Sequence, residues 1–370
     1  MKKRLLLSLC VSSLITMNLN AEEVVNLSED SKLTQALAKP EAIENHDVQF
    51  SLEVGSKINF WDPGLSKEEG QYLLDYDTEG LFLGYATLKT KIYGTDVFTL
   101  EKFSTLLSSP EQKELLSEYK ADRKEGSSLD GYKVSIQLMK VLNYLFDTNI
   151  LNGLEYKYQT RNFIGEAKLA DNALYWFGTS PGLLDIDYNQ FQKGSKLSFQ
   201  TKFTDSRILY NFTSKDGKDM GWYYIGAFHS EWSKPAYIGT TSREKNLPLI
   251  FPAKYEITGA SIGFKSEGDG LNFNVYLDYG IDNNMILNNG RNLKDTLNEV
   301  DSDLEMVSGG LDVDYTFPNI YSSHYFNLDF IISGNVYSSN MQANPEGENN
   351  SEIFDEELLY GINAAFEVRF

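Results

Sequence analysis

The residues of this sequence that come nearest to a catalytic arrangement lie in the stretch "FHSE". It contains His229, Ser230 and Glu231, and the only other histidines of the chain are His46 and His324. A histidine, a serine and an acidic side chain are the components of a hydrolase triad. Successive residues of a β-strand point to opposite faces, so in a strand Ser230 lies on the face away from the other two. The three therefore do not form a triad within this segment, and no catalytic site is predicted.

Neither a metal site nor a cofactor is predicted. Cys10 is the only cysteine, so a thiolate ligand set is excluded. Glycine-rich stretches such as "SGGL" and "GDG" lack the sequence context of a phosphate-binding loop. One carboxylate-rich loop does not have the spacing of an EF-hand. Its acidic residues are Asp295, Glu299, Asp301, Asp303 and Glu305, and a solvated loop accounts for them.

The N-terminal end has the pattern of a cleaved secretory signal over residues 1–21, with a basic start, a short apolar stretch and small Ala21 before an acidic segment. Residues 22–46 are expected to form an N-terminal periplasmic segment. Removal of the signal leaves 30 of the 33 basic residues against 53 acidic ones, a formal charge of −23. That charge excludes nucleic acid as a partner, because phosphates need a basic face.

Much of the remaining chain alternates apolar and polar residues, which is typical of β-strands with one apolar face. The clearest segments are "LNFNVYLDYGID", "VSGGLDVDYTF" and "FNLDFIISGNV". Toward the C-terminus, short turns such as "EGDG" alternate with long polar loops of about 20 residues. Short turns on one rim and long loops on the other are typical of membrane-spanning barrels. Residues 47–370 are therefore predicted to form an all-β, antiparallel transmembrane β-barrel.

Aromatic residues support a membrane-spanning barrel. Trp222 and Trp232 are ten residues apart in one predicted strand, so they share a face. At roughly 3.3 Å per residue and a tilt of about 40° they would lie about 25 Å apart along the membrane normal. That height matches an apolar band with an aromatic residue at each edge. The pair is predicted to belong to the aromatic girdle.

The first half of the chain is less regular. Residues at about 95–130 are predicted to form a small helical insert, because "SSPEQKELLSEY" has a capping box with Pro110 at the first helical position. Residues 131–147 fit either a strand or a helix. Counted as a strand, they give a barrel of about 14 strands, with 12 as the alternative. This parity places the insert on the short-turn, periplasmic rim.

The last residues, "YGINAAFEVRF", alternate without a break from Tyr360 to Phe370. This stretch resembles the terminal β-signal of Gram-negative outer-membrane β-barrel proteins, carried here by Tyr360, Gly361, Phe366, Val368 and Phe370. The resemblance implies a location in the outer membrane, recognition by the barrel assembly machinery, and contact with outer-membrane lipid and lipopolysaccharide. The oligomeric state stays open. Because a sheet in lipid leaves no unpaired edge, the last strand is expected to close onto the first.

Polar residues of the alternating strands are expected to face the interior of the barrel. Strand alternation places His229 and Glu231 on this inner face and Ser230 on the lipid face. The charged candidates for lining a pore are Asp278, Asp282, Asp312, Asp314, Asp329, Glu367 and Arg369. An excess of carboxylates would raise the local concentration of cations, unless lysines from other strands pair with them.

The function predicted from these features is a porin-like channel for small hydrophilic solutes with a preference for cations, and not an enzyme. One alternative is a closed barrel that presents its long loops as an adhesin or structural surface protein. A more distant alternative is a membrane-embedded lipid hydrolase.

Overall fold

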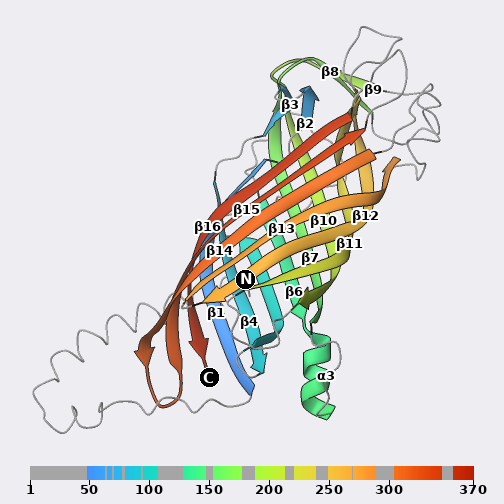
Figure 1. The fold of residues 1–370 in the computed structure, drawn as a ribbon. Coiled ribbons are helices and arrows are strands. Elements are labelled where there is room, and N and C mark those ends of the chain that lie inside the picture. Colours follow the sequence, from blue (N-terminus) through green and yellow to red (C-terminus); the bar gives the residue numbers. More distant parts are fainter. Residues whose placement is uncertain are drawn as a thin grey trace, which may run out of the picture. The chain divides into compact units, whose positions relative to one another are not determined.

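The computed structural model describes residues 48–62, 65–68, 71–76, 80–92, 95–106, 128–146, 153–176, 188–212, 221–238, 249–268, 270–287, 304–343 and 353–370. The predicted signal at 1–21 and the segment at 22–46 lie outside these residues. The described chain forms a closed antiparallel barrel of 12 strands (Figure 1). The barrel strands are β1 (Val48–Asp62), β4 (Leu81–Ile92), β5 (Thr95–Thr105), β6 (Ser128–Ile136), β7 (Leu154–Leu169), β10 (Lys196–Phe212), β11 (Gly221–Ile238), β12 (Leu249–Gly268), β13 (Leu271–Leu287), β14 (Leu304–Ser322), β15 (Asn327–Ala343) and β16 (Ile353–Arg369).

The antiparallel barrel predicted from alternation is thus confirmed, with the alternative count of 12 strands and not 14. Four short strands belong to the connections and not to the wall, namely β2 (Leu65–Glu68), β3 (Gln71–Tyr76), β8 (Ala173–Trp176) and β9 (Tyr188–Phe191). They have 4 to 6 residues each, whereas a membrane-spanning strand needs about 9 to 11. Strand-like patterns of this length therefore inflate a count made from sequence.

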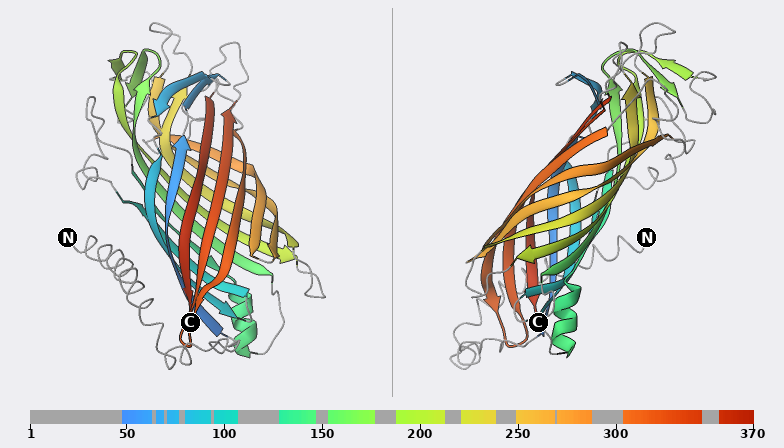
Figure 2. Two further views of the ribbon diagram at one scale, coloured as in Figure 1. Left: turned by 90° about the vertical axis from the view of Figure 1, so that its left-hand side faces the viewer. Right: turned by 45° about the vertical axis from the view of Figure 1, so that its right-hand side comes forward.

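Connections of different length separate onto two rims, as predicted. β1 begins and β16 ends at one end of the barrel (Figures 1 and 2), which we call the short-turn rim. There β12 and β13 are joined by a turn in which Gly270 has a φ of 87°, and β14 and β15 by residues 323–326. The opposite, long-loop rim carries the longer connections between β1 and β4, β7 and β10, and β13 and β14. In outer-membrane barrels the short turns are periplasmic.

The helical insert predicted at about 95–130 is wrong over its first part, because residues 95–105 form strand β5. Residues 107–127 lie outside the described residues, and β5 ends at the long-loop rim, not at the short-turn rim on which the insert was predicted. The ambiguous stretch 131–147 is divided between β6 and the helix α3 (Leu138–Phe146). α3 lies at the short-turn rim (Figure 2). In β5, apolar Val97 and Phe103 face inward while Leu100 faces outward, so this strand lacks a clean alternation.

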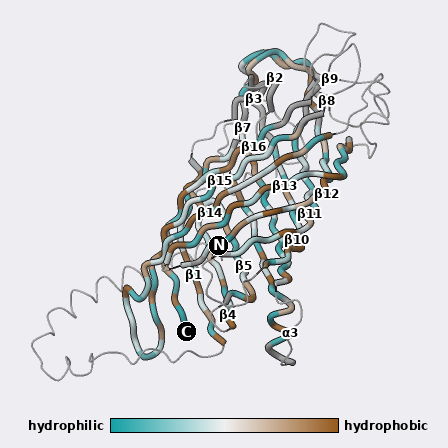
Figure 3. The backbone as a smooth tube through the Cα atoms, viewed as in Figure 1, coloured by the Kyte–Doolittle hydropathy of each residue, from teal (hydrophilic) through white to brown (hydrophobic). Residues whose placement is uncertain are grey.

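The outer face of the barrel is strongly apolar. Its exposed side chains include Leu52, Ile58, Ile225, Ile262, Leu277, Ile332, Ile362 and Phe366, and brown positions alternate with pale and teal ones along most strands in Figure 3. A soluble monomer rarely exposes so large a contiguous apolar surface. Since a closed barrel satisfies its backbone hydrogen bonds within itself, this surface is compatible with lipid, and the protein is an outer-membrane β-barrel. Among the described helices, none is long and apolar enough to span a membrane.

The first and last strands close the barrel, as expected from the terminal stretch. β1 and β16 pair over twelve residues, from Ser51 opposite Arg369 to Asp62 opposite Leu358. The backbone N–H of Phe370 donates to the carbonyl of Phe50 at 2.9 Å. In the terminal stretch, the large side chains Tyr360, Ile362, Phe366 and Phe370 are exposed on the outer face. No edge of the barrel is left unpaired at this seam.

Candidate functional site: the barrel interior

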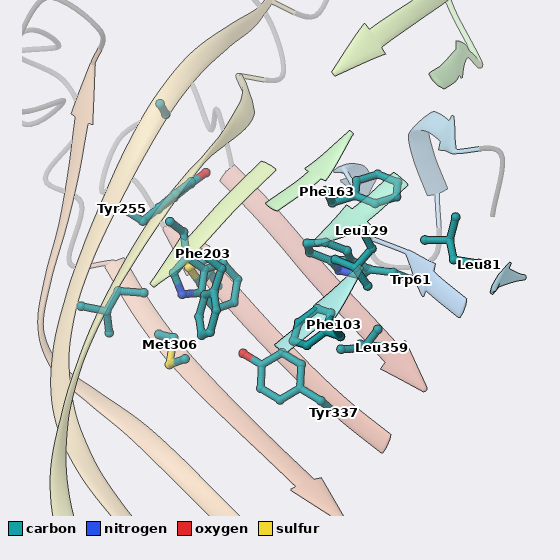
Figure 4. Packing of buried hydrophobic residues seen from close by; sticks show 14 of the residues in the cluster. Trp61, Leu81, Phe103, Leu129, Phe163, Phe203, Tyr255, Met306, Tyr337 and Leu359 are labelled. Atoms are coloured by element: carbon teal, nitrogen blue, oxygen red, sulfur yellow. The ribbon is translucent and has the colours of Figure 1, made fainter. Parts of the chain in front are cut away.

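The interior of the barrel, its lumen, contains two layers of different character. Nearer the short-turn rim, the inner side chains are charged or polar, and this set is called the charged layer: Ser51, Glu53, Lys57, Lys89, Glu101, Glu155, Lys157, Asp205, Arg207, Lys265, Asp278, Asp329, Glu367 and Arg369. Nearer the long-loop rim they are mostly aromatic and aliphatic. This apolar layer comprises Trp61, Leu81, Leu83, Leu129, Phe163, Phe203, Trp232, Tyr255, Ile257, Met285, Leu304, Met306, Tyr337 and Met341, all buried. Figure 4 shows members of the apolar layer packing together from several strands.

At the closing seam, one lysine holds two carboxylates of the charged layer. The Lys89 ammonium lies 2.7 Å from Glu53 and 3.3 Å from Glu367. Ser51 donates to Glu367 at 2.6 Å, and the Tyr85 hydroxyl donates to Glu53 at 2.7 Å. These contacts link β1, β4 and β16 on the inside of the barrel.

Ion pairs also cross between strands that are not neighbours. Arg207 on β10 lies 2.6 Å from Asp205 and 2.9 Å from Asp278 on β13. Glu155 on β7 contacts Lys265 on β12 at 2.7 Å. Two strands lie between β10 and β13 in the wall, and two strands likewise lie between β7 and β12. These side chains therefore reach across the lumen.

The structure places six of the seven predicted pore-lining residues on the inner face, and all six have partners. Asp278 pairs with Arg207, Glu367 with Lys89, and Asp329 with Arg369 at 2.7 Å. Asp312 and Asp314 accept hydrogen bonds from the side-chain amides of Asn274 and Asn272 at 3.1 and 2.8 Å. Their role in lining a pore stays a prediction. Cations thus balance the charge of Asp278, Asp329 and Glu367, whereas the partners of Asp312 and Asp314 are neutral amides.

The prediction for Asp282 is wrong, because a β-bulge reverses the alternation of β13. Thr258 of β12 lies opposite Asp282, but the next residue, Gly259, lies opposite Gly280. Ile281 is therefore the extra residue, and both Ile281 and Asp282 are exposed on the outer face. An inserted residue of this kind shifts every later side chain of a strand to the other face.

The prediction of Trp222 and Trp232 as girdle residues is also wrong. The two share a face, as predicted, but it is the inner one. Trp232 is fully buried and makes an edge-to-face contact with Phe203, with ring centroids 5.1 Å apart, and Trp222 is half-buried opposite Lys265. Because this part of the lumen is apolar, an apolar side chain in β11 does not mark the lipid side.

The inner and outer faces are also the opposite of those predicted at "FHSE". Ser230 is buried in the lumen and donates to Asp205 at 2.6 Å, whereas His229 and Glu231 lie on the outer face. His229 contacts Thr258 at 3.0 Å, and Lys254 pairs with Glu231 at 3.1 Å. The predicted separation of the serine from the other two is confirmed, while the assignment of inner and outer faces is wrong. These residues do not form a triad.

Within the apolar layer lies a charged cluster that sequence reasoning missed. Arg161 of β7 is 3.5 Å from Glu357 of β16, and Lys234 of β11 is 3.9 Å from the same carboxylate. All three side chains are almost completely buried, and β7, β11 and β16 do not pair with one another. The only signal in the sequence is that Arg161 stands in phase with Phe163 and that Glu357 stands in phase with Leu359. Among the described residues, no three potential metal ligands come together.

No protein-family model and no curated protein matches the sequence. Solved structures similar to this chain include a FadL homologue of Pseudomonas aeruginosa, with 9% identity over 90% of this chain and 94% of that one and a TM-score of 0.27. The toluene transporter TodX of P. putida has 10% identity over 90% and 92%, with a TM-score of 0.26. The translocator domain of the autotransporter NalP from Neisseria meningitidis has 9% identity over 92% and 97%, with a TM-score of 0.30. TM-scores this low carry no information about function.

Proposed function

We propose that the protein is an outer-membrane channel for small hydrophilic solutes, closed in this structure by its apolar layer. The observation that carries the proposal is the charged layer. Its side chains reach across the lumen as ion pairs and include partly exposed groups. The Lys157 side chain is 31% exposed, and neighbouring Lys133 is 50% exposed. An inner face with such groups is hydrated, because an unsolvated charge is costly. Hydrated polar groups on a barrel wall are suited to passing hydrophilic solutes.

The apolar layer supplies the barrier. Trp232, Phe203 and Tyr255 belong to different strands and are each no more than 2% exposed. A constriction of apolar side chains blocks ions by excluding water. Truncating one of its large members is therefore expected to open a path for ions, whereas a barrel that only presents loops has no path to open.

The second candidate, a non-conducting barrel that presents surface loops, is favoured by the same apolar layer. Small barrels fill their interior with side chains, and large porins leave an aqueous channel. Twelve strands lie between these limits, so the two candidates differ in one measurable property, which is conduction.

Conductance in planar bilayers tests the proposal. We expect brief openings from the folded wild type in potassium chloride, and a single-channel conductance at least twofold larger for Trp232→Ala. Phe203→Leu, a smaller truncation in the same layer, serves as a second variant if Trp232→Ala does not fold. Folding is checked by gel mobility before and after boiling. Absence of current steps from the folded wild type and a folded variant would overturn the channel and favour the loop-presenting barrel.

Reversal potentials under a salt gradient test the selectivity. Because three of the five inward carboxylates predicted to line the pore are paired with cations, we expect only a weak cation preference in potassium chloride. A strong cation preference would show that carboxylates without a cationic partner control the path.

A further inference from the structure

Arg161 lies in a setting that is unusual for a side chain whose role is structural. Its guanidinium carbon is 4.2 Å from the ring centre of Phe203, 4.9 Å from Tyr337 and 5.4 Å from Trp61. All three distances are within the range of a cation–π interaction. The rings come from β10, β15 and β1, so aromatic faces from different parts of the wall surround one cation.

Several polar atoms of this cluster lack hydrogen-bond partners among the described residues. Nε and Nη2 of Arg161 and both carboxylate oxygens of Glu357 have no hydrogen-bond partner within the described part of the chain. Arg161 and Glu357 approach to 3.5 Å, which is too long for the paired hydrogen bonds that a guanidinium and a carboxylate form at best. The indole N–H groups of Trp61 and Trp232 are also without a partner. Buried polar groups are nearly always hydrogen-bonded, so a group of exceptions in one place calls for an explanation.

These donors and rings fit one class of ligand. A planar guanidinium binds carboxylates in two parallel hydrogen bonds, and indole N–H groups donate to the same kind of acceptor. The surrounding faces of Phe203, Tyr337 and Trp61 suit a flat apolar body. Glu357, itself a carboxylate, occupies the position beside the guanidinium, but its position on β16 keeps it at 3.5 Å.

We propose that Arg161 binds the carboxylate of a small organic acid with a flat apolar body, and that Glu357 is the internal carboxylate this acid displaces. The proposal deepens the proposed function and rests on it, because it assigns the solute class that passes the apolar layer. A free carboxylate is not tethered to the wall and can approach Arg161 at hydrogen-bonding distance. Passage then exchanges one carboxylate for another at a single buried cation, which avoids leaving that cation unpaired.

Benzoate is the probe, and its binding is measured by quenching of tryptophan fluorescence in detergent-solubilised, full-length protein. We expect saturable quenching of the wild type. Glu357→Gln removes the competing carboxylate while keeping the side-chain shape, and it should tighten benzoate binding at least tenfold. Arg161→Lys keeps the charge but loses the planar fork, and it should weaken binding at least tenfold. Lys254→Gln is the control, because this lysine pairs with Glu231 and Glu256 on the outer face, and it should leave binding within twofold.

Two further ligands test whether binding needs both the negative charge and the flat apolar body. Benzamide has the same flat body without the charge, and inorganic phosphate has charge without the body; neither should give saturable quenching in the same range. Equal benzoate affinity in the wild type and Arg161→Lys would overturn the proposal, even if Glu357→Gln does not fold. Absence of benzoate binding by a wild type that conducts potassium chloride would overturn this inference and leave the channel intact. Benzoate binding without any conductance would overturn the channel.

Discussion

Glu53 and Glu367 lie opposite each other on the first and last strands, and one ammonium group, that of Lys89, contacts both carboxylates. Two like charges on directly opposed residues destabilise a strand pair. Lys89 reverses this effect at the seam where the barrel closes. The seam is therefore held by a side chain from a third strand, β4, and not by its two strands alone.

Lys89→Met is expected to destabilise the barrel by about 3 to 5 kcal/mol, because it leaves two buried carboxylates without their cation. The measurement is the temperature at which the compact form converts to the unfolded band in gel electrophoresis, together with urea unfolding in detergent. Lys133→Met is the matched control. Its ammonium is half-exposed and 3.9 Å from Glu101, which also pairs with Lys57 at 2.5 Å, so its loss should cost less than about 1 kcal/mol. Equal effects of the two variants would contradict the seam's dependence on Lys89.

Gly361→Ala is expected to weaken the same seam through packing. A Cβ at Gly361 would lie 2.0 Å from the side-chain oxygen of Asn59 and 2.8 Å from the carbonyl of Ile58, both on β1. Overpacking of this kind costs about 1 to 3 kcal/mol. Gly334→Ala on the adjoining strand is the control, since its Cβ would come no nearer than 3.6 Å to any other residue. The urea concentration at the midpoint of unfolding is compared between the two variants. A loss of stability in both variants would show that the close approach to Asn59 is not the cause.

Phe370→Asp is expected to lower the fraction of protein assembled in the outer membrane severalfold, although the backbone hydrogen bond to Phe50 is unaffected by the side chain. The Phe370 side chain is exposed on the apolar outer face, where a carboxylate is unfavourable in lipid, and it belongs to the predicted assembly signal. Tyr325→Asp provides the control, because Tyr325 is an exposed aromatic residue of a turn. Assembly is followed by heat-dependent gel mobility of membrane fractions. Normal assembly of Phe370→Asp would show that Phe370 is not part of the assembly signal.

Ser230→Ala and His229→Ala test the reversed faces of β11. Ser230 donates to Asp205 inside the lumen, so its removal should cost about 1 kcal/mol. His229 lies on the outer face, and its removal should change the free energy of unfolding by less than about 0.5 kcal/mol. Unfolding in urea measures both. A larger loss of stability for His229→Ala than for Ser230→Ala would support the predicted arrangement, with His229 inside and Ser230 on the lipid face.

The wall of the barrel was predictable because its physical cause is local. Alternation and loop length can be observed in neighbouring residues of the sequence. They predicted the closed barrel and the closure of β16 on β1. Inner and outer faces were predictable only where the lumen is polar. In β11 the lumen is apolar at Trp232, so the rule that apolar side chains face lipid fails there.

The partners within the lumen were not predictable. Asp278 was expected on the inner face, but its partner Arg207 lies on a strand three positions away in the wall. Arg161 and Glu357 are likewise far apart in the sequence. Such contacts depend on the diameter and register of the closed barrel, which no single strand contains. The bulge at Ile281 is a further example, because an extra residue leaves the local pattern of "DYGID" unchanged while reversing Asp282.

The pairing of β1 with β16 also constrains the order of folding. Ser51 and Glu367, which are hydrogen-bonded across the seam, are 316 positions apart along the chain. Contacts of such long range form late, because the entropy of closing so large a loop must be overcome before they contribute. Until β16 arrives, β1 has one unpaired edge, and that edge is stable neither in water nor in lipid. Any factor that shields β1 while the rest of the chain is still inserting would therefore control the rate at which this barrel matures.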